Sequence, residues 1–154
     1  MIESEADDLY VFDLEVNEHR AEVIGQRLQE FNEAHSRKTV SWHDPQFPPA
    51  PLEVYVLDRA GTLVGGLKGR THAIPTWLEV TCLWVDEAVR RRGLGRQLME
   101  RAEALARSRG CRYARLATCD FNAPGLYERL GYRLYGTLAN CPPGETVFYY
   151  WREL

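Results

Sequence analysis

The sequence predicts a mixed α/β fold in a single domain that spans residues 1–154. An apolar run from Trp77 to Val85 is typical of a buried strand, and the segment after Gly93 carries apolar residues at helical spacing. Seven extended and three helical segments follow one another in the order β-α-β-β-β-α-β-α-β-β. Such an order is typical of a sheet that is covered by helices.

The N-terminal part predicts a strand, a helix and a loop. Alternating apolar residues indicate a first strand over Leu9–Val16, and Asn17 is a suitable cap for a helix that ends near His35. The helix has an apolar stripe that includes Ile24, Leu28 and Phe31. Four prolines follow within Trp42–Pro51, and because proline interrupts regular backbone pairing, we expect an irregular loop there.

The middle of the chain predicts a hairpin, a buried strand and a long helix. The hairpin covers residues 52–71 with its turn at Ala60-Gly61, and the strand covers Trp77–Asp86. The helix begins after the glycines at 93 and 95, continues to about Arg109, and is ended by Gly110.

The C-terminal part predicts three strands and one short helix. A strand over Arg112–Thr118 precedes a short helix over Ala123–Leu130, which Gly131 ends. Tyr132–Leu138 and Thr146–Arg152 are then expected to form an antiparallel pair.

Composition excludes several classes of protein. With 45% hydrophobic residues the chain has enough apolar side chains for a packed core. The net charge of −3 disfavours a general nucleic-acid binder, and no apolar stretch approaches the length of a membrane span. Without CxxC or zinc-like spacing we expect reduced thiols, no metal site and a cytoplasmic protein. The cysteines are Cys82, Cys111, Cys119 and Cys141.

The stretch Arg90-Arg91-Arg92-Gly93-Leu94-Gly95 stands between the apolar strand and the amphipathic helix. A helix N-terminus offers unpaired N–H groups and the positive end of the helix dipole to an anion. Glycine allows the backbone to approach that anion closely, and arginine provides forked donors for phosphate oxygens. The turn therefore predicts a site for a pyrophosphate-bearing ligand, with an ordinary solvated loop as the alternative.

Two familiar phosphate-binding motifs do not fit this turn. A dinucleotide fingerprint requires a third glycine at Gly-x-Gly-x-x-Gly spacing, and a Walker loop requires Gly-Lys-Ser/Thr. The sequence has neither after Gly95.

With a second motif, the chain resembles the GNAT superfamily of acyl-CoA-dependent N-acetyltransferases. The run Leu126-Tyr127-Glu128-Arg129-Leu130-Gly131-Tyr132 is similar to the family's Leu-Tyr-Glu-x-Leu-Gly-Phe/Tyr helix. As in the family, a helix and a strand separate it from the Arg-x-x-Gly-x-Gly turn, and the matching run covers about residues 52–140. The resemblance implies a central mixed, mostly antiparallel sheet of about seven strands, flanked by helices.

The resemblance also implies that acetyl-CoA is the co-substrate. The backbone of residues 83–85 is expected to pair with the pantetheine arm as another strand would. Many family members have an asparagine seven residues before the helix tyrosine, where this chain has Asp120. Asn122, five residues before that tyrosine, is therefore a weaker candidate for the cofactor contact. Asp120 either faces the acceptor or caps the short helix. The expected cofactor contacts are Leu83, Trp84, Val85, Arg90, Arg91, Arg92, Gly93, Leu94, Gly95, Arg96 and Asn122.

Two side chains are candidates for proton transfer. An alkylammonium ion is only about one part in a few thousand free amine at pH 7, so a base must remove a proton before attack on the thioester. Glu79, fourteen residues before Gly93, matches the glutamate that some family members use as the base; strand alternation would place Thr81, Leu83 and Val85 on its face. Tyr127 is the candidate acid for the leaving thiolate.

Each of these residues also has a structural explanation. Glu79 would then be an exposed strand residue and Tyr127 a core aromatic. His43 and His72 are weaker candidates for chemistry near the acceptor, and an acyl-cysteine route through Cys82 or Cys119 is disfavoured, because no motif places a histidine beside either thiol.

We therefore predict an N-acetyltransferase that transfers the acetyl group directly to a small primary amine in a ternary complex. Glu79, Asp44 and Asp120 would attract a cationic amine such as a polyamine, an aromatic amine or an aminoglycoside-like compound, and Trp42 and Phe47 offer flat surfaces. The alternatives are a protein or peptide N-acetyltransferase and a non-catalytic acyl-CoA sensor. The aromatic C-terminal strand is a candidate homodimer surface.

Overall fold

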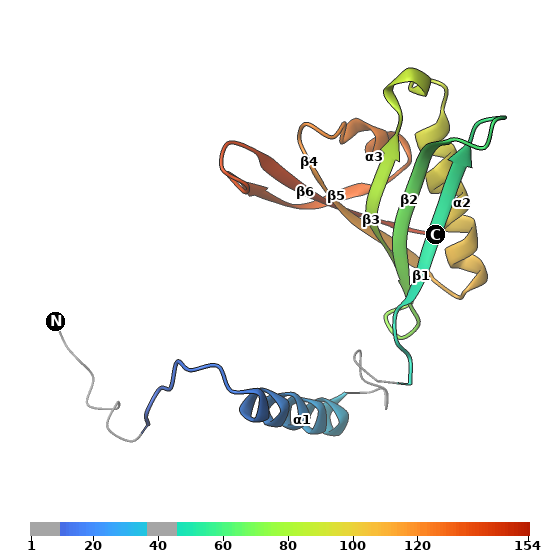
Figure 1. Ribbon diagram of the computed structural model, residues 1–154. Helices are drawn as coiled ribbons and strands as arrows, with labels where there is room; N and C mark the ends of the chain where they lie inside the picture. Colours follow the sequence, from blue (N-terminus) through green and yellow to red (C-terminus); the bar gives the residue numbers. More distant parts are fainter. Residues whose placement is uncertain (1–9, 37–45) are drawn as a thin grey trace. The chain divides into compact units, whose positions relative to one another are not determined.

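A computed structural model describes residues 10–36 and 46–154 of the chain (Figure 1). The chain divides into two compact units, residues 1–41 and residues 42–154. The predicted single domain over residues 1–154 therefore stays a prediction.

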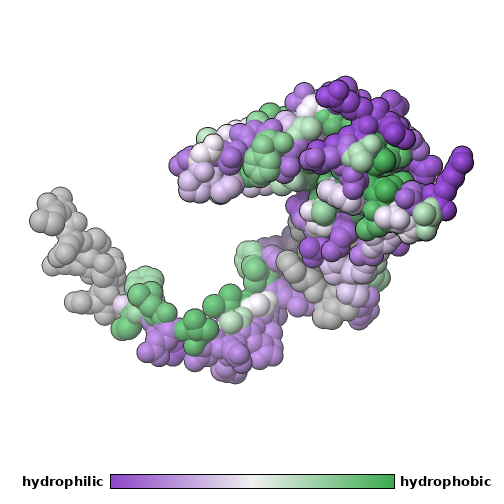
Figure 2. Space-filling view, turned by 45° about the horizontal axis from the view of Figure 1, so that its top comes forward, coloured by the Kyte–Doolittle hydropathy of each residue, from purple (hydrophilic) through white to green (hydrophobic). Residues whose placement is uncertain are grey.

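Residues 10–36 of the first unit contain one helix, α1 (Glu18–His35). The Asn17 side chain accepts a hydrogen bond of 3.0 Å from the backbone N–H of Arg20, so the predicted cap and helix are both confirmed. Apolar side chains lie along one side of the helix and polar ones along the other (Figure 2). No residue of α1 is buried, so the apolar stripe of the helix is exposed within the part of the chain that the structure describes.

The predicted first strand is wrong for residues 10–16, and Leu9 lies outside the described residues. No strand forms there because this backbone finds no strand partner among the described residues. The Asp13 carboxylate instead accepts a hydrogen bond of 3.0 Å from the Glu15 N–H and pairs with Arg20. Alternating side chains are a property of extended chain, but a strand also requires a neighbour to bond.

The second unit contains a mixed sheet of six strands, one fewer than predicted. Neighbouring strands run in the order β1-β2-β3-β4-β6-β5, and only the β3–β4 pair is parallel. Pro51 was expected in the loop but lies in β1, where an edge strand tolerates a missing N–H. The strands are β1 (Ala50–Leu57), β2 (Leu63–His72), β3 (Trp77–Val85), β4 (Tyr113–Cys119), β5 (Arg133–Ala139) and β6 (Thr146–Glu153).

Two helices, α2 (Leu94–Ser108) and α3 (Gly125–Arg129), contact the core of this sheet. Their mutual contact is close, because a Cβ at Gly95 of α2 would lie 3.5 Å from the Leu126 side chain of α3. A short 3-10 turn, η2 (Glu87–Val89), joins β3 to the glycine turn and was not predicted. The fully buried core includes Leu52, Leu67, Leu78, Leu98, Met99 and Tyr150.

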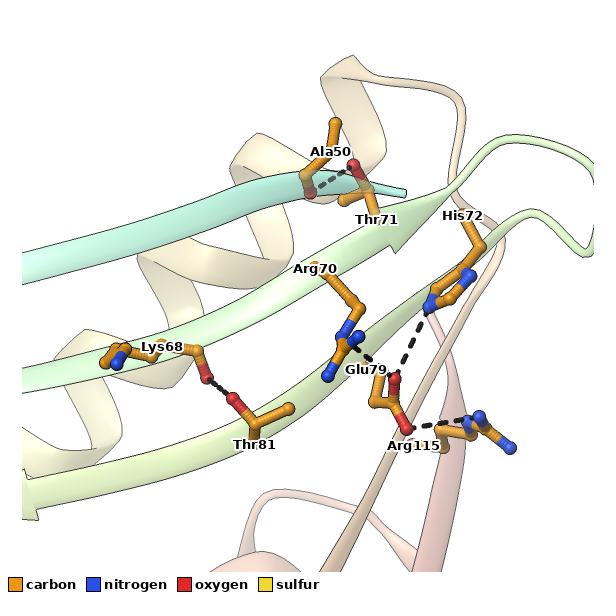
Figure 3. A network of polar contacts seen from close by, with 8 residues as sticks. All are labelled: Ala50, Lys68, Arg70, Thr71, His72, Glu79, Thr81 and Arg115. Atoms are coloured by element: carbon orange, nitrogen blue, oxygen red, sulfur yellow. Dashed lines mark hydrogen bonds and ion pairs between the residues drawn. The ribbon is translucent and has the colours of Figure 1, made fainter. Parts of the chain in front are cut away.

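A β-bulge at Thr81 changes the face that the second half of β3 presents to the core. Val80 pairs with Gly69 and Cys82 with Lys68, so Thr81 is the extra residue. Its hydroxyl group donates a hydrogen bond of 3.1 Å to the Lys68 carbonyl (Figure 3). Leu78 and Val80 face the core before the bulge, and Leu83 and Val85 pack against the core after it. The expectation that Glu79 shares a face with Leu83 and Val85 is therefore wrong.

A buried polar network ties α3 and the segment after it to α2 and β6. The Tyr132 hydroxyl donates to Glu103 Oε1 over 2.9 Å, and Arg152 lies 3.5 Å from Glu103 Oε2. The Tyr150 hydroxyl donates to Glu128 over 2.9 Å, and burial together with that carboxylate raises the pKa of Tyr150 to about 12. These contacts hold α3 against the sheet by groups that are costly to leave unpaired.

We expect Glu103→Ala to lower the free energy of unfolding by about 3 kcal/mol, because the change leaves Tyr132 and Arg152 without their buried acceptor. Glu103 is only 3% exposed. The matched control is Glu100→Ala on the same helix, whose carboxylate pairs with the exposed Arg96, so its loss should change the free energy of unfolding much less. Urea unfolding measures both, and equal losses would contradict a stabilising role for the network.

Candidate active site

The parallel strands β3 and β4 separate after a short paired stretch. Trp77–Val80 pairs with Tyr113–Leu116, and beyond that point the β4 residues pair only with β6. A cleft of about 1020 Å³ lies where the strands separate. All the predicted cofactor contacts except Arg92 line it, namely Leu83, Trp84, Val85, Arg90, Arg91, Gly93, Leu94, Gly95, Arg96 and Asn122.

The glycine turn lines this cleft with two residues of left-handed backbone. Arg91 and Gly93 both adopt left-handed conformations, with φ values of 63° and 77°. The first helical hydrogen bond of α2 runs from the Gln97 N–H to the Gly93 carbonyl over 3.0 Å. The N–H groups of residues 94–96 therefore have no acceptor within the helix, which is the arrangement that binds anions at helix N-termini.

The arginines of the turn differ in what they contact. Arg90 Nε donates to the Val85 carbonyl over 3.0 Å, so this side chain fastens the turn to the end of β3. Arg96 pairs with Glu100 at 2.7 Å. Arg90 also pairs with Glu87 at 3.4 Å. Arg91 and Arg129 line the cleft without an ion-pair partner among the described residues. These two guanidinium groups are available to an anionic ligand.

One edge of β3 is open beside the cleft. Residues 83–85 pair with Gly65–Leu67 of β2 on one side and with no strand of the described residues on the other. An open edge exposes backbone donors and acceptors that an extended ligand can bind.

Tyr127 of α3 lies at the buried wall of the cleft. The residue is 7% exposed, and its ring packs 6.1 Å from the rings of Tyr132 and Tyr150. Burial raises the pKa of the Tyr127 phenol, and the nearby Cys82 adds to the effect. The phenol therefore carries its proton at neutral pH and is able to donate it.

Glu79 lies on the face of β3 that points away from the core. Its carboxylate contacts a cluster of basic side chains there. Arg115 Nη2 lies 3.1 Å from Glu79 Oε1, and Arg70 Nε lies 3.3 Å from Oε2. His72 Nε2 is 3.4 Å from the same oxygen (Figure 3). These neighbours orient the Glu79 side chain. The side chain remains accessible, because it is 29% exposed. Glu79 is not among the residues that line the cleft.

Other predicted residues have clear positions. Asp120 accepts a hydrogen bond of 3.1 Å from the Thr146 N–H, and its contact with Glu145 raises the pKa of Glu145. Asp120 does not cap α3, because Pro124 holds the cap position without a side-chain bond. Cys82 and Cys119 are free thiols that line the cleft. The predictions for Trp42, His43 and Asp44 fall outside the described residues.

Sequence reasoning missed Arg70 and Arg115 as neighbours of Glu79, and it missed the cleft residue Arg129, whereas His72 was named as a weaker candidate near the acceptor. Arg129 occupies the variable position of the Leu-Tyr-Glu-x-Leu-Gly motif, so its charge beside Tyr127 was a usable signal. Arg70, His72 and Arg115 come from two other strands, and only the register Arg70↔Glu79↔Arg115 brings the arginines to the carboxylate.

The described residues contain neither a membrane-spanning helix nor a metal-binding cluster of side chains. No helix there is long and apolar enough to cross a membrane. No group of three or more acidic, histidine or cysteine side chains lies close enough there to hold a metal ion.

Known proteins resemble this chain in sequence and in structure. A blasticidin-S acetyltransferase of Streptomyces morookaense is 45% identical over 114 residues, which cover 71% of this chain and 82% of that protein. An acetyltransferase of Agrobacterium fabrum is 34% identical over 62% of this chain and 69% of its own length. The crystal structure of an acetyltransferase from Bacillus cereus superposes with a TM-score of 0.73 at 27% identity, covering 95% of this chain and 99% of that one.

The model of the acetyltransferase (GNAT) family matches residues 10–132, from before α1 to Tyr132, three residues after the end of α3. This range includes both motifs and every residue that lines the cleft except Val147. The chain therefore belongs to the GNAT family, and the prediction of an acetyl-CoA-dependent N-acetyltransferase is confirmed.

Proposed function

We propose that the enzyme transfers the acetyl group of acetyl-CoA to the primary amine of a small molecule by direct transfer in a ternary complex. The observation that carries this proposal is the cleft between β3 and β4, which joins the glycine turn to Tyr127. The cleft offers an anion site and a proton donor to one elongated ligand.

The turn and the open strand edge have separate parts in holding the co-substrate. The N–H groups of residues 94–96, with Arg91 and Arg129, bind the pyrophosphate. The backbone of Leu83–Val85 binds the pantetheine arm through strand-like hydrogen bonds. Bound acetyl-CoA supplies the thioester, which then lies beside the buried phenol of Tyr127.

Glu79 and Tyr127 handle the two protons of the reaction. The Glu79 carboxylate accepts the proton of the acceptor's ammonium group, directly or through one water molecule. The freed amine attacks the thioester carbonyl, the C–S bond breaks, and the Tyr127 phenol protonates the departing thiolate. The nitrogen then loses its second proton to become the neutral amide, and this proton restores the Tyr127 phenol through solvent. Arg70, His72 and Arg115 keep the carboxylate in one orientation during this exchange.

The choice of a small-molecule acceptor is supported by the relative named for blasticidin S, with 45% identity over most of both chains. A screen of small amines, amino acids and peptides with acetyl-CoA, read by release of free thiol, tests this choice. Turnover with peptides alone would overturn it.

We expect Gly93→Leu to raise the dissociation constant for acetyl-CoA at least about 100-fold, because a side chain at φ 77° distorts the turn and at least two charge-assisted hydrogen bonds are lost. The matched control is Gly110→Leu, at φ 86° just beyond the other end of α2. This control has the same backbone strain but lies away from the cleft. Calorimetry on folded samples measures both, and equal weakening would reject the turn as the pyrophosphate site.

Glu79→Gln should retain acetyl-CoA affinity and lower kcat by about 10²- to 10⁴-fold, the usual range for a general base. The acidic limb of the kcat–pH profile should disappear, since the amide has no proton to gain or lose. Glu53→Gln, on the exposed edge strand β1, should leave kcat and its pH profile unchanged. A Glu79→Gln enzyme with the parental rate at every pH would assign Glu79 a structural role.

Tyr127→Phe should lower kcat about 100-fold with acetyl-CoA while the packing of the ring is retained. The loss should shrink to about tenfold or less with an acetyl thioester of a nitrothiophenol, because that thiolate leaves without a proton. Stopped-flow measurement of thiolate release gives both rates. The same loss with both donors would show that Tyr127 does not act as the acid.

A further inference from the structure

A second pocket lies beside the Glu79 cluster and has mostly aromatic walls. It measures about 390 Å³ and is lined by Trp77, Tyr113, Ala114, Arg115, Tyr135 and Trp151. We call it the aromatic pocket. Cavities of this size hold a drug-sized ring system, and aromatic walls favour a flat one.

Four strands and a second bulge build the aromatic pocket. Trp77 pairs with Tyr113, and Arg115 pairs with Trp151, so these side chains share the sheet face that Glu79 occupies. In β5, Leu134 pairs with Tyr150 and Gly136 with Tyr149, which leaves Tyr135 as the bulged residue. This extra residue turns its ring into the pocket, 6.1 Å from the ring of Tyr149.

Arg115 connects the aromatic pocket to the proposed base. Its guanidinium carbon stands 4.0 Å from the centre of the Trp77 ring, while its Nη2 binds Glu79 at 3.1 Å. Its Nε is buried and has no hydrogen-bond partner among the described residues. Because a guanidinium group only donates hydrogen bonds, the missing partner has to be an acceptor such as a carbonyl or carboxylate oxygen.

The charges around Glu79 argue against a purely cationic acceptor. Arg70 and Arg115 place two positive charges against the single negative charge of Glu79. A polyamine would meet these arginines without any group to pair with them, whereas a ligand with an oxygen acceptor would satisfy Arg115.

We infer that the acceptor amine carries a flat ring with a carbonyl or carboxylate group, and that the ring occupies the aromatic pocket. The ring lies between Tyr135 and Trp151, its oxygen accepts from Arg115 Nε, and its amine reaches Glu79. This inference rests on the proposed function for the amine and on the pocket for the ring.

Two matched amines test the ring. The first is 4-(aminomethyl)benzamide, and the second is its saturated counterpart, 4-(aminomethyl)cyclohexanecarboxamide. Stacking on aromatic walls predicts a kcat/KM about tenfold higher for the flat amine. Tyr135→Ser should reduce this preference to about threefold or less. Tyr55→Ser, which removes a tyrosine of equal exposure on β1, should leave it unchanged (56% against 54% exposed).

A third amine, 4-methylbenzylamine, tests the oxygen acceptor. It retains the flat ring but has nothing to accept from Arg115 Nε, so its kcat/KM should fall at least about tenfold below that of 4-(aminomethyl)benzamide. Equal kcat/KM values for these two amines would overturn the part of the inference that concerns Arg115.

Binding without turnover separates the two proposals. Benzamide has no reactive amine, and it should shift the indole N–H resonances of Trp77 and Trp151 in the parental enzyme but not in the Tyr135→Ser variant. Shifts without thiol release from any amine would support the pocket and contradict the proposed function. In the opposite outcome, the flat and saturated amines would release thiol with equal kcat/KM, and benzamide would shift neither indole resonance. That result would overturn the pocket and leave the proposed function intact.

Discussion

The active site depends on the separation of the parallel strands β3 and β4. The two parallel strands share four paired residues each, after which β4 pairs only with β6 and β3 continues along β2. A closed sheet would satisfy all its backbone groups internally and leave no room for a ligand. Because the strands separate, one edge of β3 stays free, and the cleft reaches from the glycine turn to Tyr127.

The second half of β3 reaches the core only because of the bulge at Thr81. Without the extra residue, Leu83 and Val85 would share the face of Glu79, and neither apolar side chain would pack against the core. With it, one strand offers a carboxylate to one face of the sheet and apolar side chains to the other. The bulge at Tyr135 acts in a similar way in β5, since it brings an aromatic ring to the pocket beside Glu79.

Rigid anchoring of α3 matters because Tyr127 has to act at one point in the cleft. Tyr132, just after α3, binds Glu103 of α2, and Glu103 also pairs with Arg152 of β6. Within α3 itself, Glu128 accepts a hydrogen bond from Tyr150 of β6. Buried polar groups of this kind are costly when a partner is missing, so they favour a single position of the helix. The opposite carboxylate, Glu79, is held in place by arginines from two neighbouring strands.

The sequence by itself determined the elements that local patterns specify. Asn17 predicted the start of α1, Gly110 the end of α2, and the Arg-x-x-Gly-x-Gly turn predicted a helix N-terminus with free N–H groups. These features depend on residues a few positions apart, and the two motifs together were sufficient to identify the family. The order of helices and strands along the chain after Leu52 also followed from the positions of turns and apolar stretches.

Only the tertiary structure decided which side chains meet. The predicted strand over residues 10–16 had the correct alternation but no backbone to pair with. The bulges at Thr81 and Tyr135 leave no trace in a pattern of apolar residues, because a bulge is defined by the partner strand. The contacts of Glu79 with Arg70 and Arg115 depend on register across three strands, and a shift of one residue would turn each side chain to the other face.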